Sequence, residues 1–370
     1  MFIKPQGPDL TAEQARALDD DFFTSRPFEF FASRIASLIE SSERSAVDRA
    51  SSLASGFAGV LGLDDAPEIL NVDRCDRELQ IALDSLAVRH HVAEALVRFY
   101  HAVSIGPRNR SAPNVVCTWA SVCNGPIKTS DLVAETTDYL LSETGRATFW
   151  TLVVPAEADV DSLPAEGVMA RVQLLADWLV HAMRLLVRDD IDINAAHNKL
   201  KHGLAVRSRD DLRVTFIQQA PEDGTVPLSA LTSPDAIDLI DTISLDYLSR
   251  ARPRNGRKQG MEVATLRLSP ATLLAETWMM ALTYGAMFHI AAARHFGARG
   301  DVKLARYPDM PTGPTPDQLL KESVIGIRRP LTTPLDGGPS DRAAGIAFYE
   351  GFVPVNIDHA AAQSAVVVDR

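Results

Sequence analysis

Residues 270–296 read PATLLAETWMMALTYGAMFHIAAARHF and form the most apolar stretch of the chain. A serine before the stretch and the proline that opens it are typical of a helix cap and a first helical position. The stretch is nearly long enough to span a bilayer, but Glu276, His289 and Arg294 lie in or beside it. Because charged residues are rare in membrane spans, the sequence predicts a buried core helix and no membrane insertion.

Helical periodicity is also visible in most of the chain before this stretch. In residues 75–103, Leu79, Leu83 and Leu86 recur at intervals of three and four, which places them on one face of a helix. We expect further helices over residues 12–24, 27–62, 130–142, 168–188, 193–202 and 234–249. These segments predict a mainly α fold, a helical bundle.

A smaller part of the sequence favours β structure. Residues 148–154 are rich in β-prone side chains, and residues 212–218 and 261–268 are two further strand candidates. The last two flank the expected helix over residues 234–249, so we expect them to pair as a small β-ribbon insertion. A two-stranded ribbon is marginal alone and needs a helix face to cover it.

The composition changes near residue 300, where we place a domain boundary. Eight prolines lie between Pro308 and Pro354, which argues against a long regular element there. We expect residues 1–300 to form the helical domain, subdivided near the loop-like residues 105–128. Residues 301–370 are expected to form an extended proline-rich arm that wraps the domain or reaches a partner.

Charge and cysteine content limit the classes of function. The 370 residues carry a net charge of −11, so contact with nucleic acid would require a local basic patch. The three cysteines, Cys75, Cys117 and Cys123, lack zinc-finger spacing and are expected to be reduced thiols, and the first residues lack a secretory signal pattern. The sequence therefore predicts a cytoplasmic protein without a metal or cofactor.

One short motif, AHNKLKHG at residues 196–203, carries the most specific hint of function. It resembles the helix-end motif of the HEPN family of small helical RNases and their inactive relatives. In that motif an Arg is followed after four to six residues by a His, often with Asn directly after the Arg. Asn198 and His202 match this pattern, whereas His197 stands where the Arg belongs.

The resemblance implies an RNA-binding role for this segment. It assigns Asn198 and His202 to the catalytic positions, with His197 and Lys201 as binding residues. Because a guanidinium is permanently charged and a histidine titrates near neutrality, the exchange implies weak or lost cleavage. A purely structural alternative is that the cations at the end of this helix complement its dipole and that Gly203 provides a left-handed cap.

Two further helices carry polar stripes. In residues 168–188, Asp177 and His181 are spaced for a carboxylate–imidazole contact, and Arg184 on the same stripe could bind an anion. In residues 75–103 the corresponding stripe contains His91, Glu94 and Arg98, followed by His101. The alternative for both stripes is a solvated helix face with charge pairs between residues four apart.

The run RARPRNGRK at residues 250–258 contains five basic residues and no acid. In an acidic protein such a run is a candidate contact for phosphate or RNA. Its proline and glycine indicate the alternative, a solvated and mobile loop.

These observations leave three functional hypotheses. The first is a HEPN-like helical-bundle protein that binds RNA or a protein partner. The second is a hydrolase that uses the His91/Glu94 and Asp177/His181 pairs in general acid–base roles. The third is a structural or assembly subunit, a homo-oligomer in which residues 270–296 and the arm pack against another copy.

Overall fold

The computed structural model describes most of the chain. The described residues are 9–43, 60–61, 73–106, 115–155, 165–217, 236–251, 253–297, 299, 301–308 and 313–355. Among them, helical residues outnumber strand residues, so the fold is a mixed α/β fold in which helix predominates. None of the helices in these ranges is long and apolar enough to cross a membrane.

The chain forms two compact units, each built from three separate segments. The helical unit contains residues 1–35, 87–194 and 271–321, and the sheet unit contains residues 36–86, 195–270 and 322–370. The expected boundary at residue 300 and the expected subdivision near residues 105–128 do not match this division.

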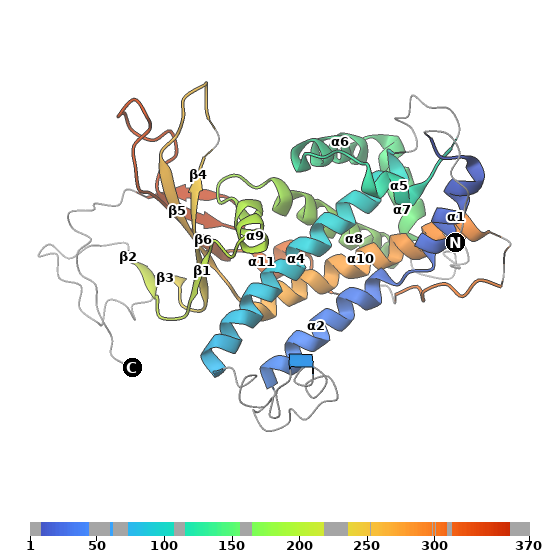
Figure 1. Ribbon diagram of the computed structural model, residues 1–370, viewed down its shortest axis with the longest axis horizontal. Coiled ribbons are helices and arrows are strands. Elements are labelled where there is room, and N and C mark those ends of the chain that lie inside the picture. The colour runs from blue at the N-terminus through green and yellow to red at the C-terminus, as the bar shows by residue number, and fades with distance from the viewer. Residues whose placement is uncertain are drawn as a thin grey trace, which may run out of the picture. The chain divides into compact units, whose positions relative to one another are not determined.

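The helical unit is organised around α10 (Figure 1), with α4 running beside it. Its elements are α1 (Ala12–Phe23), the first half of α2 (Pro27–Glu43), most of α4 (Arg74–Ser104), α5 (Thr118–Cys123), α6 (Thr129–Leu141), α7 (Glu143–Val153), α8 (Ala165–Val187), α10 (Pro270–Phe296) and α11 (Pro316–Leu320). Most of the helices expected from periodicity are confirmed within one to three residues at each end. Residues 44–59 and 62 of the expected 27–62 helix lie outside the described part of the chain.

Aromatic side chains form much of the core of the helical unit. The rings of Phe99 in α4 and Phe288 in α10 lie 5.4 Å apart, and Phe22 of α1 lies 5.4 Å from Phe288. Nearly every side chain of α10 from Leu273 to Phe288 is buried. The expectation that this segment is a core helix is therefore confirmed.

Residues 148–153 of the β-prone run 148–154 are helical and Val154 is the C-cap of that helix, so the strand prediction is wrong. Ser142 caps the N-terminus of α7, where its side chain accepts a hydrogen bond from the backbone N–H of Gly145 at 2.9 Å. Phe149, Leu152 and Val153 are buried at intervals of three and one. The cap and this helical burial outweigh the local β propensity.

The sheet unit contains a six-stranded antiparallel sheet (Figure 1) in the order β1-β4-β5-β6-β7-β8. Its strands are β1 (Arg207–Arg209), β4 (Ser244–Arg250), β5 (Met261–Arg267), β6 (Val324–Pro330), β7 (Gly345–Phe348) and β8 (Phe352–Pro354). A separate two-stranded sheet pairs β2 (Val214–Ile217) with β3 (Ala236–Ile240). Helix α9 (Ile193–Lys201) leads into β1.

Two predictions about this region need correction. The helix expected over residues 234–249 is replaced by β3 and β4, because Leu245, Tyr247 and Ser249 are buried alternately, with a period of two. The expected pairing of residues 212–218 with 261–268 does not occur, since β2 pairs with β3, while β5 pairs with β4 and β6.

The expected arm also differs from the structure, because residues 324–354 contribute three strands to the sheet. Pro330 and Pro354 are the last residues of β6 and β8. Proline is tolerated at strand ends, so here it ends strands and does not exclude them. Residues 356–370 of the arm lie outside the described residues.

Candidate functional site

The segment with the HEPN-like motif forms the exposed end of α9. Ile193 and Ala196 are buried and anchor the helix, while Asn198, Lys201 and His202 are exposed. The His202 backbone N–H donates to the Asn198 carbonyl at 2.9 Å, so the helical turn continues through His202. A separation of four residues in a helical turn places Asn198 and His202 on one face.

The helix ends as predicted before Gly203, but with a different cap. Gly203 has a φ of 157°, and the residue in the left-handed region is Leu204, with a φ of 48°. The Ala205 backbone N–H donates to the Lys199 carbonyl at 3.0 Å and so satisfies one carbonyl of the last turn. The motif thus ends the helix while leaving its polar side chains accessible.

The stripe on α8 is not arranged as a catalytic pair. Asp177 accepts a hydrogen bond from Gln173 Nε2 at 2.7 Å, whereas His181 Nε2 lies 2.8 Å from Oε2 of Glu276 in α10. The Asp177–His181 contact expected from spacing is therefore wrong. Arg184 is exposed on the same helix.

The polar residues of the stripe on α4 also contact residues other than the predicted partners. Glu94 Oε1 lies 2.7 Å from Arg98 Nε, a pair four residues apart, and Arg98 also donates to the Pro126 carbonyl at 3.2 Å. His91 is exposed, and its Nδ1 lies 3.5 Å from Nη1 of Arg34. For Glu94 and Arg98 the alternative of a helix-surface charge pair is confirmed, and the His91–Glu94 pair required by the hydrolase hypothesis is not formed.

The described residues 254–257 of the basic run form a tight turn. Arg254 and Arg257 exchange two backbone hydrogen bonds across Asn255 and Gly256, whose φ angles are 49° and 76°. Positive φ at both central residues of an Asn-Gly turn is typical of a type I′ hairpin. Arg252 of this run lies outside the described residues.

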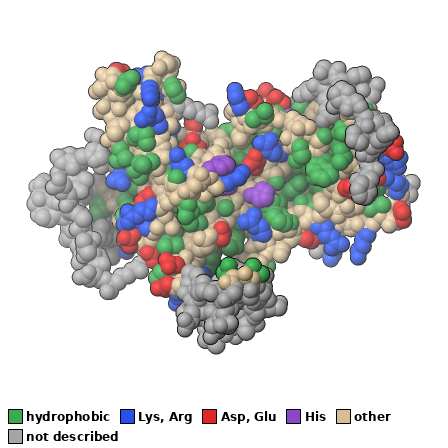
Figure 2. Space-filling model, viewed as in Figure 1, with side chains coloured by type: hydrophobic (Ala, Val, Ile, Leu, Met, Phe, Trp, Pro, Cys, Tyr) green, Lys and Arg blue, Asp and Glu red, His purple; other side chains and the backbone are tan. Residues whose placement is uncertain are grey.

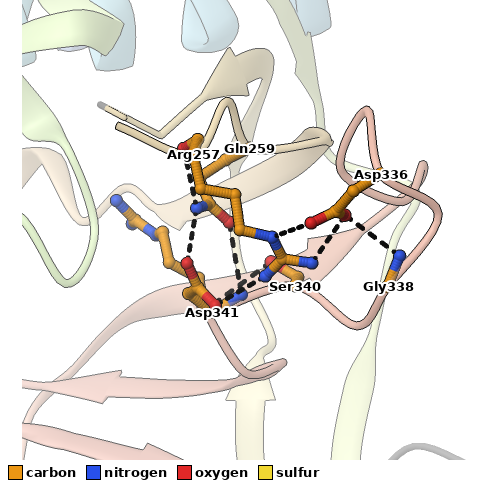
Figure 3. Close-up of polar contacts among 7 residues, drawn as sticks. Arg257, Gln259, Asp336, Gly338, Ser340 and Asp341 are labelled. Atoms are coloured by element: carbon orange, nitrogen blue, oxygen red, sulfur yellow. Dashed lines mark hydrogen bonds and ion pairs between the residues drawn. The ribbon is translucent and has the colours of Figure 1, made fainter. Parts of the chain in front are cut away.

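One cation of the run is engaged within the protein (Figure 3). Arg257 binds both carboxylate oxygens of Asp336, at 2.6 and 2.8 Å, and one of Asp341 at 2.6 Å. Gln259 Nε2 also donates to Asp341, at 2.7 Å. The Arg257 guanidinium lowers the pKa of Asp336 to about 2. Arg257 is thus committed to acidic partners, while Arg254 and Lys258 remain exposed.

Sequence reasoning missed a buried ionic cluster in the helical unit. Arg89 of α4 and His181 of α8 both contact the carboxylate of Glu276 in α10, and the relative exposure of the three residues is 5%, 3% and 2%. Burial opposes ionisation of Glu276, but the Arg89 charge and the His181 hydrogen bond outweigh it, so the pKa of this carboxyl is lowered. The available signal was Glu276 itself, since a carboxylate within an apolar core helix requires a charged partner.

The two regions differ in what they offer to a ligand. In the cluster, Arg89 occupies both oxygens of Glu276, and His181 shares one of them. At the end of α9, donors and a titratable imidazole face solvent. The exposed α9 end is therefore the better candidate for binding. Comparison with known proteins adds no relative, since no family model, curated protein or solved structure matches the chain.

Proposed function

We propose that this protein binds RNA through the exposed end of α9 and that its ability to cleave RNA is weak or lost. The observation that carries the proposal is the shared face of Asn198 and His202, with Lys201 exposed in the same turn. An ammonium group offsets phosphate charge, and an imidazole can exchange a hydrogen bond with a ribose hydroxyl.

The charges around this helix end favour an anionic ligand. Among the described residues, Lys199, Lys201 and His202 form no ion pair with an acid. Because the protein carries a net charge of −11, contact with RNA requires a local basic surface. These three residues, which form no ion pair with an acid, are a candidate for that surface. The dipole of α9 adds negative potential at the same end, and the two lysines offset it.

The competing hydrolase hypothesis has less support. In each of its two candidate pairs the carboxylate contacts a residue other than the expected histidine: Glu94 pairs with Arg98, and Asp177 accepts a hydrogen bond from Gln173. General acid–base catalysis requires the two groups within hydrogen-bond reach of each other or of a shared substrate atom. Binding at the α9 end requires no such convergence.

A direct test is to measure the binding of a fluorescently labelled single-stranded RNA by anisotropy over a salt series. We expect the dissociation constant of the parent protein to rise with salt and that of Lys201→Ala to be higher at low salt. Loss of one phosphate contact should reduce the salt slope by about 0.7. Lys303→Ala, which removes an exposed lysine of the helical unit, is the matched control and should bind like the parent. Absence of RNA binding by the parent at the lowest salt would refute the proposal.

A further inference from the structure

The sheet unit has one face that carries both arginines and aliphatic side chains. In the antiparallel register, Leu248 of β4, Val263 of β5 and Arg329 of β6 lie opposite one another. The next row contains Arg250 and Met261, and it is extended by Leu331, whose N–H donates to the Met261 carbonyl at 2.8 Å. Residues that lie opposite each other in a ladder share one face of the sheet.

The two ends of this face differ in how they are covered. At one end, Val324 and Ile346 are buried in a cluster with Leu239 of β3, against which Phe216 and Ile327 pack. At the other end, Leu248 is 51% exposed and Leu331 is 56% exposed. The second end is therefore open, and Figure 2 shows Lys and Arg side chains over the hairpin formed by β4 and β5.

Five arginines lie on this face, and acids neutralise only some of them. Arg209 pairs with Asp211 and Asp246, and Arg267 pairs with Asp241. The remaining three, Arg207, Arg250 and Arg329, are exposed and form no ion pair within the described ranges, although Arg207 acts on Asp211 at longer range. We call this open end, with Leu248, Arg250, Val263, Arg329 and Leu331, together with Arg207 on the edge strand β1 in the row of Asp246, the arginine face.

We infer that single-stranded RNA lies across the arginine face, an inference that rests on the proposed function and extends its binding surface. Three guanidinium groups that form no ion pair within the described ranges are complementary to a phosphate backbone, and a guanidinium can also stack on a base. Exposed aliphatic side chains between the arginines provide apolar contact for bases that are not stacked in a duplex. Arg250 and Arg329 are two strands and one row apart, with a Cα separation of about 12 Å, so they can contact different phosphates of one strand.

The arginine face is linked to the end of α9 by a short segment of chain. Residues 203–206 connect the helical turn at His202 to Arg207, the first residue of β1. Leu204 in this connection is 65% exposed. A single strand bound at Lys201 can therefore continue onto the edge of the sheet at Arg207.

The test compares two double variants on the same labelled single-stranded RNA. Arg250→Ala/Arg329→Ala removes two arginines of the arginine face, and Arg16→Ala/Arg26→Ala removes two exposed arginines of the helical unit as the matched control. We expect the first variant to bind about tenfold more weakly at low salt, with a salt slope smaller by about 1.4, because each phosphate contact contributes about 0.7. The control should bind like the parent, and circular dichroism should report the same fold for all three.

The outcomes of these binding measurements distinguish failure of the inference from failure of the proposed function. If Arg250→Ala/Arg329→Ala binds like the parent while Lys201→Ala is weakened, the inference about the sheet is wrong and the proposed function stands. If the parent binds no RNA, both are refuted. If poly-glutamate competes as well as RNA at equal charge, an acidic protein is the occupant and the assignment to RNA is refuted. A duplex RNA of the same length should bind more weakly than the single strand, and equal binding would also overturn the inference.

Discussion

Arg89 of α4 donates through Nη1 to both carboxylate oxygens of Glu276 in α10, at 3.1 and 3.3 Å, and both residues are buried. The pair joins two long helices that both contribute many buried apolar side chains to the core of the helical unit. His181 of α8 adds a third helix through its Nε2, 2.8 Å from Glu276. A charge in such a site is tolerated because its partners replace water.

Glu276→Ala should therefore lower the free energy of unfolding by about 3–5 kcal/mol, because it leaves the Arg89 charge buried without its partner. Urea denaturation measures this change. Arg89→Met/Glu276→Met removes both charges and should cost less than the single change. The exposed Arg74–Glu78 pair provides the control: Glu78→Ala should cost far less than Glu276→Ala, because solvent screens an exposed pair. A small effect of Glu276→Ala would mean that water reaches Arg89.

The lowered pKa of Glu276 predicts the direction of a pH effect. A carboxyl group whose folded-state pKa lies below its unfolded value contributes stability above the unfolded value, which is 4.5 for an ordinary Glu. This contribution is lost as pH falls through the folded-state pKa. Urea denaturation between pH 7 and pH 3 should show the parent losing more stability than Glu276→Gln. Parallel losses in the two proteins would contradict the ionised state of Glu276.

The Arg257–Asp336 contact should be visible in the titration of Asp336. The pKa of this exposed carboxyl is held at about 2 by the Arg257 hydrogen bonds, and Arg257→Ala should raise it toward the ordinary value of 3.8. NMR titration of the Asp336 side chain measures the change. Arg254→Ala changes a neighbouring arginine of the same turn that has no contact with Asp336, so an equal shift in that variant would argue against the direct contact.

His197→Arg restores the residue expected from the HEPN-like motif, and we expect it to increase RNA cleavage. A guanidinium holds phosphate at every physiological pH, whereas an imidazole is charged only in part. Denaturing gels of labelled RNA measure the rate. Addition of His202→Ala should abolish the gained activity. If His197→Arg does not cleave RNA while still binding it, the catalytic part of the resemblance is accidental.

Local pattern was sufficient to predict the long helices, but it missed α5 and α7 and did not predict the sheet. Periods of three and four located α4, α8 and α10 because each helix satisfies its own backbone hydrogen bonds. The ladder from Tyr247 to Ala264 to Arg328 joins residues that are up to 81 positions apart, so the pairing depends on long-range contacts. The helix predicted over residues 234–249 was wrong for this reason. The segment forms β3 and β4 on either side of a turn, and pairing with other strands sets which of their side chains are buried.

The candidate sites were likewise predicted where their residues are close in sequence and missed where they are far apart. The exposed end of α9 was found because the spacing of Asn198 and His202 is local. The Glu276 cluster joins three helices, and sequence spacing within α8 suggested Asp177 as the partner of His181 instead. The arginine face was not predicted because its members come from β1, β4, β5 and β6, and only strand register brings them together.

The interleaved segments of the two units have a consequence for synthesis on the ribosome. The central helix of the helical unit, α10, emerges only after α1, α4 and α8 have been made, and β6 follows later still, although it lies between β5 and β7 in the sheet. Apolar faces of the early helices and an unpaired edge of β5 are therefore exposed until the last quarter of the chain appears. Chains with such distant contacts fold slowly and aggregate more readily, so chaperone dependence during expression is expected for this protein.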